Sequence, residues 1–127
     1  MRDETAEWIT QAEYDIDTAQ AMFDVGRYIY CVFMSHLAIE KSLKAMVVER
    51  LREVPPKTHN LIYLLKLCKM ELSNSQVRFL TQLDTAAVAT RYPNELKMLI
   101  EQYPSSIAER YLKNAREVIK CLKLQVS

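Results

Sequence analysis

Residues that interrupt helices are scarce in this chain. It contains one glycine and four prolines among 127 residues, so few positions can break a helix. Its β-branched residues never form the alternating run that is typical of a half-buried strand. The sequence therefore predicts an all-α fold in which the few breakers mark the ends of the helices.

Two long helices are expected in the first half of the chain. Residues 4–25 carry apolar side chains at steps of three and four, and Gly26 follows where a left-handed C-terminal cap would lie. Residues 27–51 are apolar at sixteen of twenty-five positions, more than a single helical stripe can hold. The second helix is therefore expected to be central and contacted on several sides.

Shorter helices are expected after Pro55 and Pro56. Residues 61–65 are predicted to form a brief helix, with Thr58 or Asn60 as its N-terminal cap. The connection at residues 93–104 fits either a turn of helix or a loop. These elements, with no internal repeat and no long linker, predict one domain over residues 1–127 and an up-and-down bundle of four to five helices.

Two capping-box patterns mark the starts of further helices. Ser73 with Gln76 three residues later opens a helix that is expected to run to Arg91. Ser106 with Glu109 repeats the pattern and is expected to open the last helix.

Composition narrows the classes of function. Seventeen basic and sixteen acidic residues leave almost no net charge, which argues against non-specific binding to DNA or anionic membranes. Acidic residues are concentrated in residues 1–26 and basic ones in residues 104–127. The basic positions of the last helix could contact nucleic acid, or the acidic first helix could neutralise them.

The cysteines and the first residues of the chain give information about the cellular compartment of the protein. Cys31, Cys68 and Cys121 are odd in number and form no CxxC pair, so we interpret them as reduced core thiols rather than disulfides or a zinc site. The chain starts without an apolar signal region, and its longest apolar run, 28–34, is far below the ~18 residues needed to span a bilayer. A cytoplasmic protein without membrane contact is expected.

Common catalytic motifs are missing. A single glycine excludes a glycine-rich phosphate loop, and the sequence has no HExxH, paired CxxC or GxSxG motif. No metal site and no cofactor are therefore predicted.

A polar stripe interrupts the apolar second helix. His36, Glu40 and Lys44 stand four residues apart and therefore share one face. The stripe is either a set of ordinary i,i+4 pairs at the edge of the core or the wall of a cleft in which Glu40 holds His36 charged.

Other polar residues each have two alternative interpretations, one structural and one functional. His59 is interpreted as a cap or turn residue, although Arg52, seven positions earlier, formally fits a spaced arginine–histidine pair. Tyr92 beside Arg91, and Tyr103 further on, could stack on a nucleobase or simply close the end of the bundle.

Several of these segments together resemble the prokaryotic HEPN domain family. The resemblance spans nearly the whole chain in the right order and depends most on Ala38-x-Glu40-Lys41-x-Leu43-Lys44-Ala45 and on Thr90-Arg91-Tyr92-Pro93. It includes Thr58-His59-Asn60-Leu61, and Trp8, Ala12, Asp15 and Ala19 in the first helix. The resemblance implies a HEPN-like helical bundle that forms homodimers and is often encoded beside a minimal nucleotidyltransferase in toxin–antitoxin pairs.

The resemblance also implies a chemistry, because active members are metal-independent ribonucleases that use an arginine and a nearby histidine. Arg91 matches the arginine, but four, five and six intervening residues lead to Leu96, Lys97 and Met98. A guanidinium cannot transfer a proton near neutral pH, so the missing imidazole removes the general acid–base. The chain is therefore not expected to be an efficient enzyme.

The hypothesis that follows is a non-catalytic homodimer. Its surface around Arg91, Tyr92 and Glu95, with His36, Glu40 and Lys44 as further binding residues, would bind a nucleotidyltransferase partner, a nucleotide or RNA. The alternative is a ribonuclease toxin in which His36 or His59 supplies the imidazole to Arg91. A module that only dimerises is the third interpretation.

Overall fold

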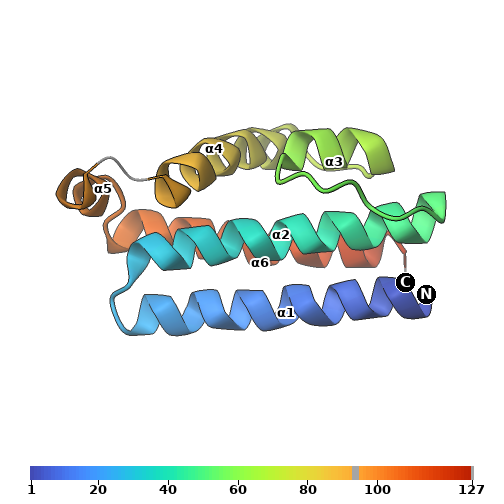
Figure 1. Ribbon diagram of the computed structural model, residues 1–127, viewed down its shortest axis with the longest axis horizontal. Coiled ribbons are helices and arrows are strands. Elements are labelled where there is room, and N and C mark those ends of the chain that lie inside the picture. Colours follow the sequence, from blue (N-terminus) through green and yellow to red (C-terminus); the bar gives the residue numbers. More distant parts are fainter. Residues whose placement is uncertain (93–94, 127) are drawn as a thin grey trace.

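The computed structural model describes residues 1–92 and 95–126, and within them the chain forms six α-helices and no strand (Figure 1). The helices are α1 (Asp3–Asp24), α2 (Tyr28–Leu51), α3 (Leu61–Cys68), α4 (Asn74–Arg91), α5 (Leu96–Gln102) and α6 (Ser105–Leu124). The predicted all-helical bundle is confirmed. The connection that fitted either a helical turn or a loop contains α5, while Pro93 and Asn94 lie outside the described residues.

The helices form a layered bundle around α2. Figure 1 shows α1 on one side of α2, α3 and α4 on the opposite side, and α6 running alongside α2. Helix α2 contacts each of the other five described helices, as expected from its many apolar positions. The short α5 lies at the end of the bundle where α4 finishes, away from the two chain termini.

Local sequence signals account for three of the helix ends. Gly26, which follows the C-cap residue Val25 of α1, has φ +79°, a conformation that glycine adopts without steric cost. Ser73 and Gln76 form the predicted capping box of α4. The side chain of Asn60 caps α3 by accepting the Tyr63 N–H, and α3 runs three residues past the predicted Leu65.

The predicted start of the last helix was wrong. Helix α6 begins at Ser105 with Pro104 at the N-cap position, and no side chain caps its first turn. Ser106 therefore lies inside the first turn rather than before it, so it cannot form a capping box with Glu109. Pro104 favours this earlier start because its fixed φ is compatible with the extended backbone of the N-cap position, and it has no N–H to leave unpaired.

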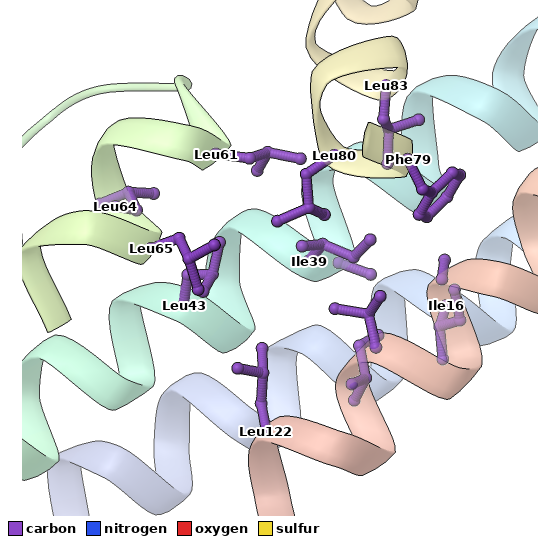
Figure 2. Packing of buried hydrophobic residues seen from close by; sticks show 14 of the residues in the cluster. Ile16, Ile39, Leu43, Leu61, Leu64, Leu65, Phe79, Leu80, Leu83 and Leu122 are labelled. Carbon is purple, nitrogen blue, oxygen red and sulfur yellow. The ribbon is translucent and has the colours of Figure 1, made fainter. Parts of the chain in front are cut away.

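The core joins the faces of the helices that point toward α2. Figure 2 shows Ile39 and Leu43 of α2 close to Leu80 of α4 and Leu65 of α3. The largest completely buried side chains include Ile39, Leu43, Met46, Leu61, Leu64, Leu80, Leu83 and Leu122. Helices α3 and α4 are therefore fixed against α2, and α2 and α4 carry most of the site described below.

Charged side chains connect the acidic first helix to the basic last one. Lys123 of α6 forms an ion pair with Glu13 of α1, and Arg116 donates a hydrogen bond to Gln20 at 3.1 Å. Part of the basic surface of α6 is thus neutralised within the fold. None of the described helices combines the length and the hydropathy of a membrane span.

The three free thiols should differ in reactivity. Cys31 and Cys68 are buried and Cys121 is half-buried, so the expectation of core thiols holds for the first two. Burial raises the pKa of Cys31 to about 11 and also raises the pKa of Cys68. At pH 8 we expect iodoacetamide to modify Cys121 first, and Cys31 and Cys68 only when the fold opens.

Peptide mass spectrometry after timed labelling measures this difference. A Cys121→Ser variant is the control, because it should lose the fast phase and keep the two slow ones. Rapid labelling of Cys31 in the native protein would contradict the expectation.

Candidate functional site

A hollow of about 210 Å³ opens beside the middle of α2, between the start of α3 and the end of α4. It is lined by His36, His59, Asn60, Asp84, Ala87, Val88, Arg91 and Tyr92. These residues come from α2, from the segment before α3 and from α4. We call this hollow the His59–Arg91 pocket.

His36 lies beneath the pocket and is paired with Asp84. Its Nε2 lies 3.0 Å from Asp84 Oδ1, and the residue is only 1% exposed. Its other ring nitrogen, Nδ1, is buried without a hydrogen-bond partner among the described residues. The geometry therefore favours a neutral ring that donates from Nε2 to Asp84, since a proton on Nδ1 would be buried without an acceptor.

Asp84 also holds the start of α3. Its two carboxylate oxygens accept the backbone N–H of Leu61 at 3.0 and 3.1 Å, and Oδ2 accepts that of Ile62 at 3.4 Å. A carboxylate near a helix N-terminus satisfies free N–H groups and interacts favourably with the helix dipole. One side chain of α4 thus orients both His36 and the α3 wall of the pocket.

Glu40 is the more deeply buried of the two carboxylates of the site, since it is only 3% exposed. Its Oε2 accepts a hydrogen bond from Lys44 Nζ at 3.0 Å, while its Oε1 lies 2.8 Å from His59 Nδ1. Lys44 Nζ lies in turn 5.9 Å from the centre of the Trp8 ring. Glu40 therefore links α2 to the segment that precedes α3.

The predicted pairing within the polar stripe is partly wrong. Glu40 and Lys44 form the i,i+4 pair, but Glu40 contacts His59 rather than His36. His36 turns instead toward Asp84, 48 residues further along the chain. Residues four apart on one helix face share a direction, yet His36 pairs with α4 while Glu40 pairs with Lys44 of the same helix and with the segment before α3.

His59 differs from His36 in being open to solvent. Its side chain is 60% exposed, and its described polar contact is the one with Glu40. It does not cap α3, because Asn60 does. Of the two histidines, His59 is the one that a ligand in the pocket can reach.

Arg91 ends α4 on the opposite side of the pocket. Its guanidinium carbon lies 5.0 Å from the centre of the Phe33 ring, an arrangement in which the aromatic face stabilises the cation. Tyr92 follows at the rim and is 72% exposed. Glu95 is exposed at the start of α5 and does not line the pocket. Glu40 and Lys44 do not line it either, and Glu40 reaches it only through His59.

A second hollow of similar volume lies at the turn between α1 and α2. Its lining is mostly aromatic and aliphatic, and Arg27 is its one charged residue among those described. Tyr103 also lines it, and burial raises the pKa of that phenol. This hollow brings no histidine or carboxylate together among the residues described, so the His59–Arg91 pocket is the better candidate for chemistry.

The His59–Arg91 pocket combines a guanidinium that lies against an aromatic ring with an exposed imidazole. A guanidinium can bind a phosphate group through two parallel hydrogen bonds, and an imidazole can donate or accept a proton. The aliphatic wall of Ala87 and Val88 and the exposed Tyr92 ring could contact a sugar or base. Within residues 1–92 and 95–126, no three histidine, cysteine or acidic side chains gather as metal ligands would.

Asp84 and Asn60 are the polar pocket residues that the sequence interpretation did not assign to the site, and the apolar Ala87 and Val88 were not assigned to it either. A signal for Asp84 was present, because it precedes Arg91 by seven residues and therefore lies two turns away on the same face of α4. Asn60 was expected only as a cap.

The chain is a small helical-bundle protein with a polar pocket between its helices. Comparison with known proteins identifies its family. Residues 5–125 match the HEPN domain family, so the chain belongs to it. A Methanocaldococcus jannaschii protein named Putative toxin MJ1304 is 29% identical over an alignment 128 residues long. The alignment covers 91% of this chain and 84% of that protein.

Two crystal structures have the same fold. TT1696 from Thermus thermophilus has a TM-score of 0.83 at 20% identity, covering 97% of this chain and 98% of that one. The archaeal HEPN homologue ST0689 has a TM-score of 0.78 at 21% identity, with both chains covered completely.

Proposed function

We propose that this HEPN protein is a homodimeric binding module of a toxin–antitoxin-like system, which binds a phosphate group of a nucleotide or RNA in the His59–Arg91 pocket. The observation that carries the proposal is that Arg91 and the exposed His59 line one pocket. Arg91 would bind the phosphate, while Tyr92 at the rim would stack on a base.

A minimal nucleotidyltransferase is the proposed protein partner. The name of the archaeal relative, Putative toxin MJ1304, supports a toxin–antitoxin setting for this chain. The surface of α5 supports a partner or a second copy at the same end of the bundle, because Leu96, Met98 and Ile100 are each more than half exposed. Exposed apolar surface of this kind is typical of protein contact sites.

Loss of the Arg91 guanidinium should weaken ligand binding. In Arg91→Ala we expect the affinity for ATP or for a short single-stranded RNA to fall about 10- to 100-fold, the range for losing a hydrogen bond to a charged group. Isothermal titration calorimetry with both probes measures the affinities and separates the two ligand classes. Arg78→Ala is the matched control, since Arg78 is an exposed arginine of the same helix outside the pocket.

If both substitutions lowered the affinity by the same small factor, general charge attraction rather than the pocket would explain the binding. Failure of the wild-type protein to bind either probe would contradict the proposed pocket. The partner is tested separately, by asking whether a tagged nucleotidyltransferase from the same operon purifies together with this chain.

A second candidate function is metal-independent RNA cleavage. The observation that favours it is the contact between buried Glu40 and exposed His59 on a pocket that Arg91 also lines. An imidazole oriented by a carboxylate can act as a general base, and a neighbouring arginine can stabilise a developing phosphorane charge. The 1% exposed His36 is too deeply buried for this role.

A ribonuclease assay in EDTA decides between binding and cleavage. Cleavage by the wild type that disappears in both Arg91→Ala and His59→Ala, and persists in Arg78→Ala, would establish the second candidate. RNA binding without cleavage would support the binding module.

A further inference from the structure

We propose that Glu40 is a positioning residue that fixes the His59 imidazole with a proton on Nδ1 and thereby presents Nε2 to the pocket. The nature of the ligand at Nε2 rests on the proposed function, whereas the orientation of the ring does not. Four observations support this assignment.

The first is the immobility of the carboxylate. Glu40 is almost fully buried on α2, and each of its oxygens has a partner. Lys44, one turn later on the same helix, holds Oε2, and Lys44 itself is only 8% exposed. The carboxylate cannot rotate toward solvent without leaving the Lys44 ammonium unpaired in a largely buried position.

The second observation is the backbone around His59. The N–H of Thr58 donates to the Pro56 carbonyl at 2.9 Å, and the N–H of Asn60 donates to the Thr58 hydroxyl at 3.2 Å. The next N–H, that of Leu61, is held by Asp84. Hydrogen bonds therefore hold the main chain on both sides of His59. The orientation of the imidazole ring then depends on its contact with Glu40.

The third observation is the chemistry of that contact. A buried carboxylate paired with an ammonium is an acceptor only, so at 2.8 Å it requires a proton on Nδ1. A neutral ring then carries an unprotonated Nε2 that can accept from a hydroxyl. A charged ring keeps the Glu40 contact and can donate from Nε2 to a phosphate oxygen. A nucleotide offers both groups, a ribose hydroxyl and a phosphate.

The fourth observation is the charge balance of the surroundings. The charged and titratable groups near His59 are Glu40 and Lys44 with His36 on α2, Asp84 with Arg91 on α4, and the phenol of Tyr92 directly after α4. Lys44 offsets the charge of Glu40. The carboxylate of Asp84 accepts from His36 and from the first N–H groups of α3, and the positive end of the helix dipole partly offsets its charge. Arg91 is thus left as the cation that a phosphate would meet opposite the His59 ring.

Nitrogen-15 NMR of the histidine rings tests the assignment directly on the ligand-free protein. In the wild type at a pH where the rings are neutral, we expect His59 to carry its proton on Nδ1. His36 provides an internal reference, because its contact with Asp84 predicts the opposite tautomer. A wild-type His59 with its proton on Nε2 would overturn the proposal.

Two variants separate positioning from a merely structural role. Glu40→Leu combined with Lys44→Met removes the acceptor and the buried ammonium together, so the fold is not left with an unpaired charge. We expect His59 to lose its preference for the Nδ1 proton in this double variant. Glu40→Gln keeps an acceptor oxygen and should retain the preference in part. An unchanged tautomer in the double variant, with its helical circular dichroism intact, would refute the role of Glu40.

Ligand affinity then distinguishes this proposal from the proposed function. If wild type binds ATP or RNA, the double variant should lose as much affinity as His59→Ala, and an unchanged affinity would count against Glu40. If wild type binds neither, the proposed function fails, while the NMR result still decides the ring assignment.

Discussion

Replacing Asp84 with alanine is expected to lower the free energy of unfolding by about 2–4 kcal/mol. The substitution removes two kinds of contact at once. Leu61 and Ile62 lose the carboxylate that accepts their N–H groups at the start of α3, and His36 loses its partner while it remains 1% exposed. A helix cap contributes about 0.5–2 kcal/mol and an unsatisfied buried donor costs about 1–3 kcal/mol.

Urea denaturation followed by circular dichroism measures this loss. Thr85→Ala is the matched control, because Thr85 is the exposed neighbour on α4 and its hydroxyl donates to the Thr81 carbonyl of the same helix. The control should change stability by no more than about 0.5 kcal/mol. An equal effect of both substitutions would mean that Asp84 neither caps α3 nor supports His36.

The Asp84 contacts illustrate what the sequence could not reveal about the site. Helical spacing places His36, Glu40 and Lys44 on one face of α2, and the structure retains that alignment. Their partners depend on how α3 and α4 pack against α2, since Asp84 is 48 residues from His36 and His59 is 19 from Glu40. Packing that joins distant segments determines these pairs, and no local pattern carries that information.

The same distinction applies to the helices themselves. The capping box of Ser73 and Gln76 was predictable because the atoms that form it lie within one helical turn. The equally plausible Ser106 and Glu109 pattern failed, since Pro104 starts α6 before it. Helix α5 was not predictable as a helix, because its seven residues are flanked by prolines and bury only Leu99.

Asp15 and Lys41 both belong to the segments that resemble the HEPN family, and the structure shows that they form an ion pair. Their spacing in the sequence did not predict this contact. Lys41 Nζ of α2 lies 2.9 Å from Asp15 Oδ2 of α1, and the Asp15 side chain is only 7% exposed. The same oxygen makes no aligned hydrogen bond within the described part of the chain, so the contact is an ion pair without strong directionality. Charge compensation, rather than hydrogen-bond geometry, therefore permits the burial of this carboxylate between the two long helices.

Lys41→Met is accordingly expected to destabilise the protein by about 3–5 kcal/mol, because it leaves a buried carboxylate without a counter-charge. The double variant Asp15→Leu/Lys41→Met should recover most of this loss, since an apolar pair needs no compensation. Urea denaturation of the wild type, both single variants and the double variant gives the coupling energy between the two residues. Strictly additive effects would show that Asp15 gains its stability from other groups and that Lys41 is an ordinary surface lysine.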